Sequence, residues 1–148
     1  ENNSHVENQF MNILFLCVGN SARSQIAEGL AKQMFGDDHI IHSAGSQPCR
    51  YVHTGAIKVM NEIGIDISSF TSKSIDELDD NFKNNLDYVI TLCSEEICPY
   101  LNGNFNKLNW ANEDPADYKL NAIESNMLFQ KTRDNIYNLL KKFMLDNL

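Results

Sequence analysis

The feature that most constrains this chain is an apolar run that leads into a cysteine-containing loop. Residues 13–18 are apolar without a break over the length of one strand, which is typical of a strand covered on both faces of a sheet. Cys17 lies near the end of this run, and Arg23 follows it with five residues between them. Apolar residues then recur at helical spacing from Ile26 to Met34. The pattern predicts a strand, a short loop and a helix that begins at the loop.

Strands and helices are expected to alternate along the rest of the chain. The apolar periodicity predicts three further strands and two further helices, at 39–43, 86–92 and 107–110 and at 56–63 and 136–144, respectively. Such alternation predicts a single-domain, doubly wound α/β sheet of about four parallel strands with helices on both faces. Ligands bind these sheets beyond the carboxyl ends of the strands, so Cys17, Cys93 and the loop after Trp110 are expected at one rim.

Charge and composition narrow the classes of function. Twelve Lys and Arg residues against 20 Asp and Glu residues give a net charge of −8, which opposes attraction to nucleic acid or to an anionic membrane. Residues 1–10 lack the basic and apolar regions of a secretory signal, and no run approaches the roughly 20 apolar residues of a membrane span. We therefore expect a cytoplasmic protein, with 1–10 a leader or expression remnant and 11–148 one domain.

The loop that follows Cys17 predicts an oxyanion site. Five residues between a cysteine and an arginine allow backbone N–H groups to surround a tetrahedral oxyanion, and the helix N-terminus adds partial positive charge. Such a nest favours a thiolate, so Cys17 is the candidate nucleophile and Arg23 the candidate clamp for two oxyanion oxygens. The alternative is a buried structural cysteine beside an exposed arginine. The candidate oxyanion-binding residues are Val18, Gly19, Asn20, Ser21, Ala22, Arg23 and Ser24, of which Ser24 is expected to donate to the thiolate.

A second pair of cysteines follows the predicted strand at 86–92. Four residues separate Cys93 from Cys98, and a thiol pair in a loop is suggestive of redox chemistry. Two unrelated structural cysteines are an alternative, and so is half of a zinc site completed by Cys49, His42 or His53. Zinc ligands are usually closer together and occur in two pairs, and the sequence holds no second pair, so no metal site is predicted.

Phe15 to Lys32 and Ser43 to Gly45 carry a pattern that resembles the low molecular weight protein tyrosine phosphatase superfamily. Other segments are similar to one branch of it, the thioredoxin-coupled arsenate reductases. These segments are Gly64 to Ser68, Thr91 to Ser94 with Cys98 and Pro99, and Trp110 with Glu113 to Ala116. The similarity runs from about Met11 to Ala116 and resumes at Phe129, Gln130, Arg133 and Asp134.

The resemblance to the reductases implies a thiol relay. In such a relay, Cys17 attacks arsenate, Cys93 then attacks Cys17 as arsenite leaves, and Cys98 attacks Cys93, which frees Cys17. The resulting Cys93–Cys98 disulfide is reduced by thioredoxin. The alternative within the superfamily is a phosphatase that hydrolyses phosphomonoesters through a phosphocysteine at Cys17. A third hypothesis is a non-catalytic module that binds an oxyanion or senses oxidation.

The resemblance also implies a general acid. Asp114, which precedes Pro115, matches the acid that protonates the oxygen leaving phosphorus or arsenic. Glu113 is the competing carboxylate. The stretch 116–128 is longer than expected for a reductase and is interpreted as an insertion, in which Tyr118 stands alone where the phosphatases have adjacent tyrosines.

Some reductases of this branch bind potassium beneath the loop. Asn20, Glu28 and Ser43 match three of the ligands, but Lys73 stands where those enzymes have an aspartate. The Lys73 ammonium is expected to pair with Glu28, so we predict neither a potassium requirement nor a cofactor. Cys49 has no counterpart in the relay and is interpreted as a bystander.

Overall fold

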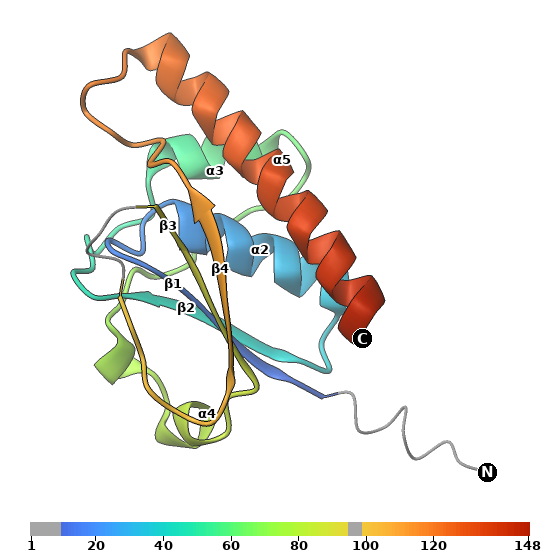
Figure 1. Cartoon of the computed structure of the whole chain (residues 1–148). Coiled ribbons are helices and arrows are strands. Elements are labelled where there is room, and N and C mark those ends of the chain that lie inside the picture. The colour runs from blue at the N-terminus through green and yellow to red at the C-terminus, as the bar shows by residue number, and fades with distance from the viewer. Residues whose placement is uncertain (1–9, 95–98) are drawn as a thin grey trace.

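A four-stranded parallel sheet forms the centre of the molecule (Figure 1). The computed structural model describes residues 10–94 and 99–148. Its strands lie in the order β2-β1-β3-β4, and all three pairings are parallel. The predicted fold is confirmed. The strands are β1 (Asn12–Cys17), β2 (Ile40–Gly45), β3 (Tyr88–Cys93) and β4 (Asn106–Asn112).

Helices cover the two faces of the sheet unequally. The long helices α2 (Arg23–Phe35), α3 (Thr54–Asn61) and α5 (Ala122–Asn147) pack on one face, whereas the short η1 (Ile75–Glu77) and α4 (Asp80–Asn84) lie on the other. Side chains alternate along β1 accordingly: Ile13 and Phe15 enter the first core, and Leu14 and Leu16 enter the second. All four of these side chains are fully buried, which explains the unbroken apolar run in the sequence.

The structure corrects the prediction for two segments. The last helix begins at Ala122 rather than near Ile136, so most of the stretch interpreted as an insertion is its first two turns. Asn121 and Glu124 form a capping box there, a signal that the sequence carries and the apolar periodicity does not. The helical segments η1 and α4 were not predicted, because each is too short to show a period. Residues 1–9 lie outside the described part, so the leader stays a prediction.

The carboxyl ends of the strands meet at one edge of the sheet, as predicted. Cys17 pairs with Gly45, and Cys93 pairs with Asn112 at the end of β4. A side chain at Gly45 would collide with the backbone oxygen of Val18, so glycine permits the close approach of β2 to the loop after β1. This edge carries the candidate site.

Candidate active site

The loop between β1 and α2 has the geometry of an anion-binding nest. Asn20 adopts the left-handed conformation, with φ of 49°, and is fully buried. Ala22 is the N-cap of α2, and within the described residues no side chain caps this helix. The first N–H groups of α2 therefore lie at the mouth of the loop with the positive end of the helix dipole. A tetrahedral anion is the natural ligand of this arrangement.

Cys17 lies at the base of the nest and contacts Ser24. The Cys17 Sγ lies 2.9 Å from the Ser24 Oγ, and both residues are buried. The Asn20 Nδ2 donates to the same Ser24 Oγ at 2.8 Å. Since Ser24 accepts that bond, its own hydrogen is free to point at the sulfur. The predicted contact between Ser24 and Cys17 is present, and Ser24 is placed to donate to the sulfur.

Residues beneath the loop determine that Ser24 is the donor in its hydrogen bond with Cys17. A carboxylate only accepts hydrogen bonds, so Ser43 must donate to Glu28, at 2.6 Å between Oγ and Oε1. Ser43 then accepts from the Asn20 Nδ2 at 2.9 Å. The backbone N–H of Lys73 donates to the Asn20 Oδ1, which fixes the orientation of the amide. The donor and acceptor roles along this series of hydrogen bonds, which ends at Cys17, are therefore set by the buried carboxylate of Glu28.

Two lysines neutralise Glu28. Lys32 is 2.6 Å from one carboxylate oxygen, and Lys73 is 3.9 Å from the other. The predicted pairing of Lys73 with Glu28 is confirmed. Burial lowers the pKa of Lys73, and Glu28 opposes part of that shift. Because an ammonium group already lies beside Glu28, the residues behind the loop do not fit a potassium ion.

Turnover and thermal stability are expected to be equal in potassium and sodium chloride at matched ionic strength. The Lys73 ammonium supplies the positive charge that a monovalent ion would bring to Glu28. Unfolding temperature and turnover, measured while potassium replaces sodium, test this expectation, and an increase specific to potassium would contradict it. Lys73→Ala serves as the contrasting variant, because it leaves Lys32 as the described cation paired with Glu28.

Arg23 and Asp114 lie in the same hollow as Cys17. This hollow of about 380 Å³ is lined by both residues and by Cys17. The Arg23 Nη1 donates to the backbone oxygen of Asn112 at 2.7 Å, which ties the predicted clamp to the loop that carries Asp114. Asp114 is half-buried, with its Oδ1 accepting from the Ala116 N–H at 3.0 Å. Glu113 is exposed and does not line the hollow, so geometry favours Asp114 as the acid.

One wall of the hollow was not predicted. It comes from the segment after β2, whose backbone N–H groups bond to carbonyls of the oxyanion loop: Gln47 to Val18, Cys49 to Gly19 and His53 to Ser21. Four of its residues line the hollow: Gln47, Cys49, Tyr51 and His53. Since β2 neighbours β1 in a parallel sheet, the rule that placed Cys93 at the rim also places this segment there. Cys49, interpreted as a bystander, is a free thiol in the wall.

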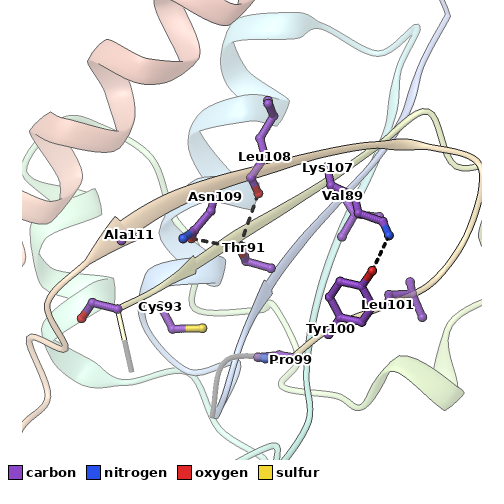
Figure 2. Close-up of a pocket in the computed structure, with 11 residues that line it drawn as sticks. Val89, Thr91, Cys93, Pro99, Tyr100, Leu101, Lys107, Leu108, Asn109 and Ala111 are labelled. Carbon is purple, nitrogen blue, oxygen red and sulfur yellow. Dashed lines mark hydrogen bonds between the residues drawn. The ribbon is translucent and has the colours of Figure 1, made fainter. Parts of the chain in front are cut away.

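Cys93 lies at the same rim but faces a different hollow, shown in Figure 2. That hollow, of about 410 Å³, has Cys93 in its lining, whereas Cys17 lines the oxyanion hollow. Cys93 is disulfide-bonded and 2% exposed, whereas Cys17 is a free thiol. Cys98 lies outside the described residues, so its pairing with Cys93 stays a prediction. No group of three or more metal-ligating side chains occurs in the described ranges.

A buried cysteine in a backbone nest, an arginine at the following helix start and a carboxylate in the lining of the same hollow are the features of enzymes that attack tetrahedral oxyanions through sulfur. The family model for low molecular weight phosphotyrosine protein phosphatase matches residues 12–148, and the chain belongs to this family. Across 10–94 and 99–148, none of the helices combines the length and apolar content of a membrane span.

The curated relatives are named arsenate reductases, and the similar solved structures include both arsenate reductases and a tyrosine phosphatase of T. tengcongensis. The arsenate reductase of Bacillus subtilis (strain 168) is 43% identical over 133 residues, which are 88% of this chain and 93% of that protein. A solved arsenate reductase in its phosphate-binding state has 30% identity and a TM-score of 0.77, covering 93% of this chain and 99% of the other. The thioredoxin-dependent arsenate reductase of Corynebacterium glutamicum has 28% identity and a TM-score of 0.68, covering 97% of this chain and 66% of that one.

Proposed function

We propose that this protein reduces arsenate to arsenite in the cytoplasm. The observation that carries the proposal is the combination of two different cysteines at one sheet rim. Cys17 is a free thiol in an oxyanion nest, and disulfide-bonded Cys93 ends the neighbouring strand. A phosphatase needs only the first of these. The identity to arsenate reductases over most of the chain supports the same function.

The proposed first step is attack of the Cys17 thiolate on arsenic. Arg23 and the loop N–H groups hold the other oxygens, and Asp114 gives a proton to the oxygen that leaves as water. The product is a covalent sulfur–arsenic(V) adduct on Cys17. Because the loop recognises shape and charge, phosphate binds in the same way.

The second step transfers two electrons to arsenic. The Cys93 thiolate attacks the Cys17 sulfur, and the electron pair of the broken sulfur–arsenic bond stays on arsenic, which leaves as arsenite. A Cys17–Cys93 disulfide remains. Cys98 then attacks Cys93, which frees Cys17, and thioredoxin reduces the Cys93–Cys98 disulfide. No metal or cofactor takes part.

The test is oxidation of NADPH upon addition of arsenate to this protein, thioredoxin and thioredoxin reductase. Arsenate-dependent turnover is expected, with one arsenite formed for each NADPH oxidised. Absence of that turnover, together with steady hydrolysis of an aryl phosphate, would contradict the proposal and identify a phosphatase.

The phosphatase alternative has one observation of its own. Tyr51, which is 57% exposed, lies on the wall of the oxyanion hollow and offers an aromatic surface at its mouth. Tyr118, which the sequence suggested as a displaced counterpart of the phosphatase tyrosines, is 90% exposed and does not line the hollow. Hydrolysis of aryl phosphates is therefore expected as a side activity.

Asp114→Asn is expected to lower the kcat for hydrolysis of aryl phosphates by about 10²–10³-fold. The reason is that the amide cannot donate the proton that the leaving oxygen needs. The loss should be greater for phenyl phosphate than for p-nitrophenyl phosphate, since the poorer leaving group depends more on protonation. Glu113→Gln is the matched control, with a neighbouring exposed carboxylate outside the hollow. An equal loss in that control would contradict the assignment of the acid.

A further inference from the structure

Two free thiols share the oxyanion hollow. Cys17 lies at its base and is 3% exposed, whereas Cys49 lies in its wall and is an exposed residue. These are the two free cysteines within the described ranges. Cys93 lines the other hollow, on the opposite face of the sheet. The thiol that shares a cavity with the nucleophile is therefore Cys49, which the proposed relay does not use.

The Cys49 side chain is turned toward the loop that encloses Cys17. A Cβ atom built on Gly19 would lie 2.8 Å from the Cys49 Sγ, so a side chain at position 19 would displace this sulfur. Gly19 is only two residues after Cys17 in the oxyanion loop. Because Gly19 has no side chain, nothing at this position separates the Cys49 sulfur from the loop backbone around the nucleophile.

Hydrogen bonds on both sides of Cys49 hold it in the wall. Its N–H donates to the Gly19 carbonyl oxygen at 2.8 Å. The next residue, Arg50, adopts the left-handed conformation with φ of 71°, and its N–H donates to the Ser72 Oγ at 3.0 Å. The Ser72 hydroxyl donates to the same Gly19 oxygen at 3.1 Å. The turn at Cys49 is therefore attached to the oxyanion loop, which keeps this thiol next to the loop that contains the nucleophile.

A nucleophilic cysteine is also the thiol that oxidants attack. A sulfur that attacks oxyanions attacks hydroperoxides as well, and the product is a sulfenic acid. The sulfenic acid either condenses with a second thiol or is oxidised further to sulfinic and sulfonic acids, which thiols do not reduce. The loop residues 18–24 contain no second cysteine. Protection of Cys17 therefore requires a thiol from outside its own loop, and Cys49 is positioned to supply it.

We propose that Cys49 is a resolving thiol that converts peroxide-oxidised Cys17 into a Cys17–Cys49 disulfide. The Cys17 thiolate attacks the terminal oxygen of a hydroperoxide, the oxygen–oxygen bond breaks, and the departing alkoxide or hydroxide takes up a proton. The Cys49 thiolate then attacks the sulfenic sulfur of Cys17, and the hydroxide that leaves becomes water. Two thiols are oxidised and one peroxide is reduced. While this disulfide persists, the hollow has no nucleophile, and an added dithiol restores both thiols. The proposal rests on the proposed function only for the nucleophilic role of Cys17.

The test measures how much Cys17 survives oxidation. The protein is reduced with dithiothreitol, freed of the reductant, exposed to excess hydrogen peroxide and reduced again. Peptide mass spectrometry then gives the fraction of Cys17 that can be alkylated. In the wild type most of Cys17 should return as a thiol, and peptides joined through Cys17 and Cys49 should be present before the second reduction. In Cys49→Ser the fraction that returns should fall at least about fivefold, because sulfinic and sulfonic acids resist dithiothreitol.

Cys93→Ser is the matched control, because it removes the cysteine that ends the strand beside β1. This variant should match the wild type in the joined peptides and in the fraction of Cys17 that returns. Equal return of Cys17 in Cys49→Ser and in the wild type would overturn the proposal. A return that depends on Cys93 and not on Cys49 would overturn it as well. The assay contains neither arsenate nor thioredoxin, so failure of the proposed function would show instead in the NADPH assay.

Discussion

Cys17→Ser is expected to abolish arsenate reduction and aryl phosphate hydrolysis together, with a loss of about 10⁴-fold or more in kcat/KM. A serine hydroxyl at the base of the nest stays protonated at neutral pH, and the side chain that contacts this position is the Ser24 hydroxyl, which is not a base. Both activities are measured on the same preparation, with the fold checked by circular dichroism.

Cys49→Ser is the matched control for this prediction. Cys49 is also a free thiol and lines the same hollow, but it is exposed and lies in the wall rather than at the base of the nest. Its variant should keep both activities within about twofold, as a surface substitution outside the machinery does. If Cys49→Ser lost as much activity as Cys17→Ser, the assignment of a single nucleophile would be wrong.

The parts of the site that could be predicted are those whose chemistry depends on neighbours in sequence. A loop between a buried strand and a helix must expose N–H groups at the helix start, so Cys17, Arg23 and Ser24 could be assigned from spacing. The strand-end rule then brought Cys93 and Asp114 to the same rim. The structure confirms the fold and these positions, while the catalytic roles stay predictions.

The parts that were missed depend on side chains that meet only in three dimensions. No sequence pattern marks the wall of the hollow, which consists of Gln47, Cys49, Tyr51 and His53. These residues are positioned by backbone hydrogen bonds to the neighbouring loop. The start of α5 was missed for another reason. Its first turns expose Ile123 and Met127, so the apolar stripe that marks a helix begins later than the helix does.

The two hollows separate the two halves of the proposed reaction. The oxyanion hollow holds a free thiol, a cationic clamp and an acid, which suffice for attack on a tetrahedral anion. The hollow beside β3 and β4 holds the disulfide-bonded Cys93. Cys17 and Cys93 end neighbouring strands but point to opposite faces of the sheet, so the proposed relay requires the strand ends to rearrange before the two sulfurs meet. Substitutions can therefore remove one half of the chemistry without the other.

Cys93→Ser is expected to end arsenate reduction while aryl phosphate hydrolysis stays within about twofold of the wild type. Without Cys93, the sulfur–arsenic adduct on Cys17 lacks the thiol that attacks it in the proposed relay, and no arsenite is formed. Hydrolysis needs only water at the phosphocysteine, and Cys93 does not line the hollow where this occurs. Cys98→Ser should instead release one equivalent of arsenite and then stop, because a Cys17–Cys93 disulfide forms and persists.

Measurement of arsenite and hydrolysed phosphate on the same variants distinguishes the functions. A relay gives three results: no arsenite from Cys93→Ser, a single equivalent from Cys98→Ser, and hydrolysis in both. Full arsenate turnover in Cys93→Ser would contradict the relay, because no other described thiol ends a strand beside Cys17. Equal loss of hydrolysis and reduction would show that Cys93 supports the oxyanion loop rather than the electron transfer. Loss of arsenate reduction with retention of phosphate hydrolysis in Cys93→Ser is thus the outcome that distinguishes a reductase from a phosphatase in this fold.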